Sequence, residues 1–350
     1  MDATAGSTQD EQGRQGQQGA HDEGPRPVLQ RARGAALLIA VLLVPTLAAG
    51  ALVGGVGGLG AAAAGAIYGL ILALRAGWRT ALALVPVLAL ATVGTVLAHG
   101  SPWWVAWLGV LGLATGLAAR AGLMGPVALV CAGAASVQPG SGSRFVVVLC
   151  AVAASVYAAL VARRVGVPPS RSARRVPTRD ALSLGLVAGL GSAAAAWLAD
   201  TWDAPHAYWL PVTVFLLLVP QKGSLGAAVL ARAAGTVLGI VVGVLAPLGD
   251  LPPVLHAVAL VVLLVATLTW TSPLWLNTAL ATVVLMRVLD PAGRGWAVGS
   301  ERLVAVVGAV VVVLVGALAL RLVPRAPAAT GPPALTDDDD ADRPAGPSAV

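Results

Sequence analysis

The chain has 350 residues, of which 57% are hydrophobic and only 11% are charged, and its mean hydropathy is +0.84. Soluble domains carry about 25% charged residues, so this composition argues against a soluble protein and indicates bundled membrane helices. The formal net charge is +6. The arginines lie between apolar runs and form no basic patch, which argues against nucleic-acid binding.

The chain opens on residues 1–33, which are rich in Gln, Gly, Asp and Ser and have no apolar period. We expect this segment to be a disordered cytoplasmic tail. The first apolar run begins only after Arg31 and Arg33 and is long enough to cross a bilayer, so it is not read as a cleaved secretory signal. From residue 35 to residue 323, apolar runs alternate with charge, Pro and Gly.

A membrane-spanning helix needs about 20 residues, so these runs predict an all-α polytopic membrane protein with about 12 transmembrane helices in two six-helix halves. The predicted spans are 35–53, 56–74, 80–98, 104–119, 122–138, 145–162, 181–199, 207–221, 228–247, 253–269, 274–289 and 303–322. The domains are a first half at 34–165, a basic cytoplasmic linker at 166–180, a second half at 181–323 and a disordered acidic tail at 324–350.

The two halves resemble one repeated unit. Each has a basic loop between its second and third helices, containing Arg75 and Arg79 in the first half and Lys222 in the second, with Arg232 just beyond it. Because each half has an even number of spans, both enter the membrane in the same direction, which predicts a parallel repeat about the membrane normal. A fusion of two unlike halves would give a similar pattern.

The basic residues predict the orientation of the chain in the membrane. Cytoplasmic loops of membrane proteins carry an excess of Lys and Arg. With both termini in the cytoplasm, most of the basic residues fall on the inner side. The exceptions are Arg144, Arg287, Arg294 and Arg302. The sequence therefore predicts a multi-pass protein of the cell membrane with both termini cytoplasmic, and the lipid bilayer as its surroundings.

Residues 206–248 contain the most informative pattern. Two apolar segments flank a short loop with Lys222, the only lysine of the chain. The first segment opens on Tyr208 and Trp209, which suit a membrane interface, and it also contains Thr213. The second segment carries glycines at intervals of four residues, which place them on one stripe where another helix can pack closely. These predicted packing residues are Gly235, Gly239 and Gly243.

Arg232 lies about 6 Å from the inner end of its predicted span, at about 1.5 Å per residue. Two interpretations are open: the side chain snorkels to the headgroups, or it faces a central cavity and meets a substrate carboxylate. Thr236 follows one turn later, and we expect its hydroxyl to bond a carbonyl of its own helix.

Polar residues on the last two spans complete the candidate pathway. Asn277 is the only asparagine of the chain and is followed by Thr278. Such residues either bridge helices or line a pathway. Arg302 follows Glu301 at the outer end of the last helix, where a local ion pair is the simpler expectation. The candidate substrate-pathway residues are Tyr208, Trp209, Thr213, Arg232, Thr236, Asn277, Thr278 and Arg302.

Two motifs in the second half carry a family resemblance. From Tyr208 to Gly243 the chain has a Tyr-Trp pair near a proline, a basic loop, and then Arg-x-x-Gly-Thr-x-x-Gly. This run is similar to the FUSC family of fusaric-acid-resistance and aromatic-acid-exporter membrane proteins. The chain near Glu301-Arg302-Leu303 resembles the second Arg-led helix of that family, with Gly308 and Gly316 as small packing positions.

The resemblance covers roughly residues 180–322 well and the first half in outline. It implies an integral membrane transporter that exports small amphipathic or aromatic carboxylates. The second helix of each half is the place to look for the site, because one is broken by glycines and the other is short and flanked by prolines, and interrupted segments at matching positions are typical of a binding site. Two departures stand out. Val307 replaces the threonine that the family has before the glycine of its last helix, and the chain lacks the large cytoplasmic domain of many members. The missing domain puts any function that it carries in doubt.

Enzyme motifs are missing. The sequence has no Walker loop, no HExxH and no set of residues for an activated nucleophile, so we expect no enzyme, no cofactor and no metal. Its acidic residues lie at span ends, so proton coupling would use acids at the rim or energy from a partner. We expect a small-molecule substrate; a homo-oligomer and an accessory export partner both stay open.

Two other functions are considered. A major-facilitator-like permease also has twelve spans, but the loop between its second and third helices resembles Gly-x-x-x-Asp-Arg-x-Gly-Arg-Arg. The corresponding loop here, Arg75-Ala-Gly-Trp-Arg79, has no Asp. A non-transporting membrane scaffold is the other alternative, and the absence of a central water-accessible cavity would favour it.

Overall fold

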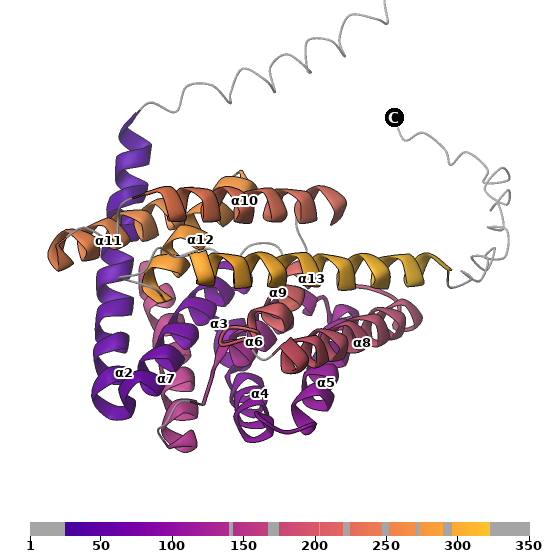
Figure 1. The fold of residues 1–350 in the computed structure, drawn as a ribbon. Helices are drawn as coiled ribbons and strands as arrows, with labels where there is room; N and C mark the ends of the chain where they lie inside the picture. The colour runs from indigo at the N-terminus through magenta and orange to yellow at the C-terminus, as the bar shows by residue number, and fades with distance from the viewer. Residues whose placement is uncertain are drawn as a thin grey trace, which may run out of the picture.

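The computed structural model describes residues 25–139, 143–166, 175–202, 204–219, 225–246, 252–269, 273–289 and 296–322, and within them the regular structure is entirely helical (Figure 1). The helices are α2 (Pro25–Ala76), α3 (Trp78–Ala83), α4 (Val85–Ala98), α5 (Trp103–Leu117), the short 3₁₀ turn η1 (Ala118–Ala121), α6 (Met124–Ser136), α7 (Arg144–Val165), α8 (Thr178–Trp202), α9 (Trp209–Leu218), α10 (Leu225–Leu245), α11 (Pro253–Thr269), α12 (Leu274–Leu289) and α13 (Trp296–Leu322).

Each predicted span lies on a helix. The spans 35–53 and 56–74 are the two arms of α2, the span 80–98 falls on α3 and α4, and each later span falls on one helix from α5 to α13. Length divides these helices into two groups. Within the described residues, six helices are long and apolar enough to cross a membrane, and α4, α6, α9, α11 and α12 are apolar but shorter. The all-helical membrane class is confirmed, whereas twelve full-length spans are not.

A reversal at Gly55 divides α2 into its two arms. Gly55 has φ 58° and ψ −143°, a conformation that residues with a side chain rarely adopt. The arms then lie against each other, since a Cβ on Gly50 would come within 2.7 Å of the Ala62 Cβ. In a straight helix these two residues would be separated by about 18 Å along the axis. A single glycine therefore replaces a loop.

Small residues allow the long helices to pack closely. On α2, a Cβ at Gly65 would overlap the Ala151 carbonyl of α7, and Ser155 of α7 donates a 2.9 Å hydrogen bond to the Gly65 carbonyl. On α5, a Cβ at Gly112 or Gly116 would overlap the backbone of α8. The pair α5 and α8 thus joins the two halves along a glycine-lined seam, as small residues commonly do between membrane helices.

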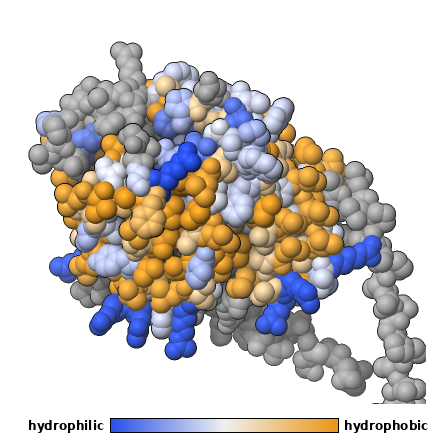
Figure 2. All heavy atoms as spheres, turned by 90° about the horizontal axis from the view of Figure 1, so that it is seen from below, coloured by the Kyte–Doolittle hydropathy of each residue, from blue (hydrophilic) through white to orange (hydrophobic). Residues whose placement is uncertain are grey.

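The most buried helices are two short ones, α6 and α9, which pack against each other across the halves. Phe215 of α9 is fully buried, and the neighbouring Val214 is almost as inaccessible. Outside this core, hydrophobic residues cover broad areas of the face drawn in Figure 2, and hydrophilic residues lie along its lower edge and across its upper part. An apolar exterior around an apolar core is the pattern of a membrane protein.

The packing partners of the helices show partial likeness between the halves. In the first half both α2 and α4 pack on α7, α4 also packs on α6, and α5 packs on α6. In the second half α8, α9 and α10 pack on α13, α10 also packs on α12, and α11 packs on α12. The orientations differ, because α10 and α13 lie nearly horizontal in Figure 1 whereas α2 and α7 stand upright. The predicted parallel repeat is therefore not confirmed.

Candidate functional site

Arg302 on α13 reaches towards α9. Its Nη1 atom lies 3.4 Å from the Thr213 hydroxyl, and its Cζ lies 5.3 Å from the ring centroid of Trp209. The Nε atom is buried and has no hydrogen-bond partner. A guanidinium over an aromatic face gains a cation–π interaction, but this does not replace a hydrogen-bond acceptor for the buried N–H group.

Arg232 and Thr236 contribute two further unsatisfied atoms from α10. The Nε atom of Arg232 and the hydroxyl of Thr236 are both buried without a hydrogen-bond partner. The expectation that Thr236 bonds a carbonyl of its own helix is therefore wrong. Arg232 also lies within electrostatic range of Arg302 and Arg75, so α10, α13 and the end of α2 bring like charges together.

Tyr68 lies near Arg232 and Arg302, and these residues together are called the arginine cluster. Tyr68 was not among the residues predicted from the sequence. It lies on the second arm of α2, within electrostatic range of Arg232, Arg302 and Tyr208. The chain has only three tyrosines, and a single tyrosine in an arm of Gly, Ala and Leu was the available signal. The site therefore includes residues from the second predicted span of each half, which are the second arm of α2 and helix α9.

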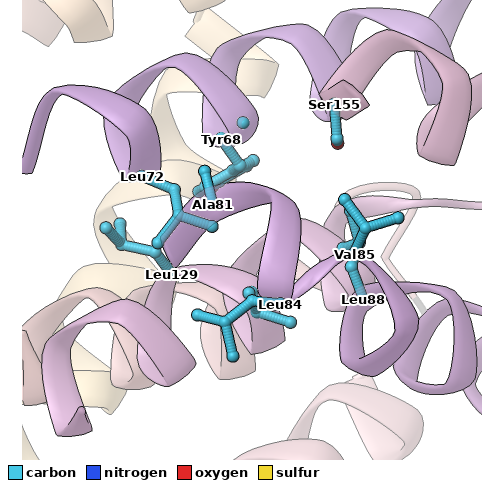
Figure 3. Close-up of a pocket in the computed structure, with 10 residues that line it drawn as sticks. Tyr68, Leu72, Ala81, Leu84, Val85, Leu88, Leu129 and Ser155 are labelled. Carbon is cyan, nitrogen blue, oxygen red and sulfur yellow. The ribbon is translucent and has the colours of Figure 1, made fainter. Parts of the chain in front are cut away.

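Tyr68 also lines a small internal cavity between α2, α3, α4, α6 and α7 (Figure 3). The cavity has a volume of about 10 Å³, which is room for roughly one water molecule. Its other walls are mostly apolar, with Leu72, Leu84 and Leu129 among them. Tyr68 thus lines a small, mostly apolar cavity and also lies within electrostatic range of the arginines.

A wider groove of about 450 Å³ lies between α4 and α5. Its walls are Gly94, Leu97, Ala98, Ser101, Trp103, Ala106, Trp107 and Val110. This groove has no charged wall to orient an anion, so we place the candidate site at the arginines instead.

Glu301 and His206 are in hydrogen-bond contact between α13 and the turn before α9. The His206 Nδ1 atom lies 2.7 Å from the Glu301 Oε2 atom. The expected local pair between Glu301 and Arg302 is not formed, because the two neighbouring side chains have different partners. The imidazole also stacks on the indole of Trp209, with ring centroids 4.8 Å apart. Sequence spacing missed this contact because the partners are separated by 95 residues.

Asn277 and Thr278 have other partners. The Asn277 side-chain amide donates a 2.6 Å hydrogen bond to the Thr267 carbonyl of α11. The Thr278 hydroxyl donates to the Leu274 carbonyl of its own helix. Of the two open interpretations, this geometry favours helix bridging for Asn277.

The glycines of α10 lie along α12. A Cβ on Gly235 would lie 2.2 Å from the Trp275 carbonyl oxygen, and one on Gly239 would lie 2.6 Å from the Ala279 carbonyl oxygen. Gly243 meets the side chain of Met286. On α13, a Cβ at Gly308 would have Leu210 at 3.1 Å, and one at Gly316 would have Val187 at 2.6 Å.

Some predicted features lie outside the described residues, among them Lys222 and the acidic run Asp337–Asp340. Within the part that the structure describes, no cluster of His, Cys, Asp and Glu could hold a metal ion.

Comparison with known proteins supports the resemblance found in the sequence. A family model described as fusaric acid resistance protein-like matches residues 192–316. This match runs from α8 into α13, includes Arg232 and Arg302, and confirms the resemblance for the second half. It indicates a transporter-like membrane protein. Searches of curated proteins and of solved structures gave no significant match.

Proposed function

We propose that this chain, whose residues 192–316 match the fusaric acid resistance protein-like family, is an integral membrane transporter that binds a small organic anion at Arg232 and Arg302. One observation carries the proposal. Both arginines have buried Nε atoms without a hydrogen-bond partner, and no carboxylate of the described chain forms an ion pair with either. A buried guanidinium N–H group without an acceptor is costly inside a membrane protein.

A bound carboxylate would satisfy these groups. Its two oxygens can accept hydrogen bonds from guanidinium N–H groups, which suit planar anions. The Thr236 hydroxyl is also buried without a partner and can donate to the same ligand. The anion would further reduce the repulsion that Arg75 and Arg302 each exert on Arg232.

The surroundings of the arginines favour an anion with an aromatic or amphipathic body. Trp209 stands beside Arg302, and Tyr208 contacts Trp209 with ring centroids 6.0 Å apart. Aromatic side chains provide apolar area and preferred ring-to-ring geometries. The proposed substrate class is therefore small aromatic carboxylates. The proposed direction of transport is outward across the cell membrane, and both termini are proposed to lie in the cytoplasm.

Binding of benzoate to the purified protein in lipid nanodiscs tests this proposal. We expect measurable binding by calorimetry, weaker binding of the neutral analogue benzamide, and a loss of about tenfold or more in affinity for Arg302→Gln or Arg232→Gln, since a hydrogen bond to a charged group contributes about 1.5–3 kcal/mol. The matched control is Arg33→Gln, because Arg33 is exposed. Equal affinity in the double variant and the wild type would show that these arginines do not bind the anion.

Export provides the second measurement. Cells that carry the wild-type protein should retain less labelled benzoate than cells with the double variant at equal membrane levels. Thiol labelling extends the test to the pathway: in a background without Cys131 and Cys150, a cysteine at Thr236 should react with a membrane-impermeant reagent, and benzoate should protect it. Failure of the cysteine to react in any condition would favour a dry bundle and a scaffold.

A further inference from the structure

We propose that His206 and Glu301 form a proton-binding pair whose charge controls anion binding at Arg302. This inference rests on the proposed function, because it concerns the same site. The two side chains come from different parts of the fold: His206 lies in the turn before α9, and Glu301 lies on the second turn of α13. Their 2.7 Å contact links these elements.

The pair is positioned to exchange protons with water. The side chains of His206 and Glu301 are 22% and 19% exposed, so neither is sealed in the core. Histidine is the side chain that ordinarily changes charge between pH 5 and 8. When the pH falls, the imidazole takes one proton from water and becomes an imidazolium beside the carboxylate. The net charge of the pair then changes from −1 to 0, and the proton returns to water when the pH rises.

Two connections carry this charge change to the anion site. Glu301 precedes Arg302 in the chain, so the acid and the anion-binding guanidinium share one turn of α13. The imidazole stacks on Trp209 at an interplanar angle of 24°, and the same indole lies beneath the Arg302 guanidinium. His206, Trp209 and Arg302 thus form a continuous series of contacts from the pair to the site.

The sign of the effect follows from electrostatics. An unprotonated pair places a net negative charge close to a site that binds anions, and this charge repels the ligand. Protonation removes that repulsion, so anion affinity increases as the pH decreases. Binding is reciprocal: an anion at Arg302 attracts the proton to His206, and the protein should take up protons when the anion binds.

Other titratable and charged groups lie on the elements that surround this pair. Tyr208 contacts the imidazole ring, with centroids 6.2 Å apart, and ordinarily titrates well above pH 8. The described groups on the helices that pack against α9 or α13 are Cys131 on α6, Arg179, Asp180 and Asp200 on α8, Arg232 on α10 and Arg287 on α12. None of these is a histidine, the side-chain type that ordinarily changes charge between pH 5 and 8.

The experiment measures benzoate affinity in nanodiscs between pH 5.5 and 8, where benzoate stays an anion. We expect about tenfold tighter binding at pH 5.5 than at pH 8 in the wild type, which is within the usual range of coupling between two sites. His206→Gln keeps a hydrogen-bonding side chain but cannot take the proton, so its affinity should not depend on pH. Glu301→Gln should bind more tightly than wild type at pH 8, because the repelling charge is gone.

A purely structural role gives a different result. If the pair only positions α9 against α13, then His206→Gln will lower benzoate affinity by the same factor at every pH. Its affinity will then depend on pH as steeply as that of the wild type, and this result overturns the proposal. Calorimetry in two buffers with different ionisation heats adds a second readout: proton uptake on binding should be present in the wild type and absent in His206→Gln. His99→Gln is the matched control and should keep both signals.

The same measurements separate this inference from the proposed function. Benzoate binding that is present but independent of pH overturns the proton pair and leaves the anion site intact. Absence of benzoate binding in the wild type at every pH overturns the anion site and the proton pair with it. Thermal unfolding of each variant at pH 7 establishes that it is folded, and Glu301→Gln provides the test if His206→Gln does not fold.

Discussion

Arg287 holds the end of α10 from the neighbouring helix α12. Its Nη2 atom donates a hydrogen bond to the Ala246 carbonyl at 2.7 Å and another to the Gly243 carbonyl. The last carbonyls of a helix have no partner in the helix and carry the negative end of its dipole. The guanidinium satisfies both requirements, and its side chain is only 2% exposed. This contact gives a structural reason for a buried arginine in the last turn of the apolar helix α12.

Replacement of this arginine should destabilise the protein. Arg287→Met keeps much of the apolar stem but leaves the two carbonyls without their donor, and each charge-assisted hydrogen bond contributes about 1.5–3 kcal/mol. We expect a lower midpoint of thermal unfolding in detergent. The unfolding midpoint of Arg287→Lys should lie between those of Arg287→Met and the wild type, because lysine keeps the charge but not the planar donors. If Arg287→Met unfolds at the same temperature as the exposed control Arg33→Met, the contact has no stabilising role.

The seam between α10 and α12 should not tolerate a methyl group. Gly239→Ala would place a Cβ against the Ala279 carbonyl oxygen and the Thr282 side chain, so the helices must move apart at a cost of about 1–3 kcal/mol. Gly226→Ala on the same helix is the matched control, because a Cβ there meets nothing within 4 Å. Unfolding in a denaturing detergent titration measures both variants, and equal midpoints would contradict the close packing of this seam.

The reversal at Gly55 should require glycine. Gly55→Ala must keep a backbone conformation with φ 58° and ψ −143°, which residues with a side chain adopt at a cost of about 1–3 kcal/mol. Gly60→Ala on the second arm is the control, since a Cβ at Gly60 has open space; it should leave stability unchanged or raise it by up to about 1 kcal/mol. The comparison uses thermal unfolding of the two variants. A Gly55→Ala protein as stable as Gly60→Ala would mean that the arms meet in another conformation.

His99, in the turn after α4, should make stability depend on pH. Burial lowers the pKa of His99, and the charge of Arg144 lowers it further, against an opposite effect of Asp200. The folded state therefore binds its proton less readily than the unfolded state, where histidine titrates near about 6.5. Stability should be greatest above that pH and decrease as the pH falls below it. Between pH 7 and 5 the unfolding midpoint of His99→Gln should decrease less than that of the wild type. An identical decrease in the two proteins would rule out His99 as the cause.

The positions of the helices along the chain could be predicted from the sequence, because they follow from the positions and lengths of the apolar runs. The turn at Gly55 divides two predicted spans where the sequence has a run of glycines, and the boundaries of α11 and α12 are as predicted. The orientation of the helices was not accessible in the same way. Hydropathy gives the length of α10 but does not say that the helix lies at a steep angle to α2 (Figure 1).

The candidate site was partly predictable for a similar reason. Arg232 was conspicuous as the one charge in an apolar run, and Arg302 as the start of a motif. The contact between His206 and Glu301 depends on the packing of α9 against α13, which no local spacing encodes. Arg302 was expected to bind Glu301 because the residues are adjacent, yet neighbouring side chains on a helix point about 100° apart. Glu301 therefore faces His206 while Arg302 faces Thr213.

The single-residue reversal at Gly55 has a consequence for how the chain enters the membrane. A loop between two spans can cross the bilayer after the first helix is already in place. With one glycine between the arms of α2, no polar segment is available for such a delayed crossing. We therefore expect the first two arms to enter the bilayer together, as one hairpin.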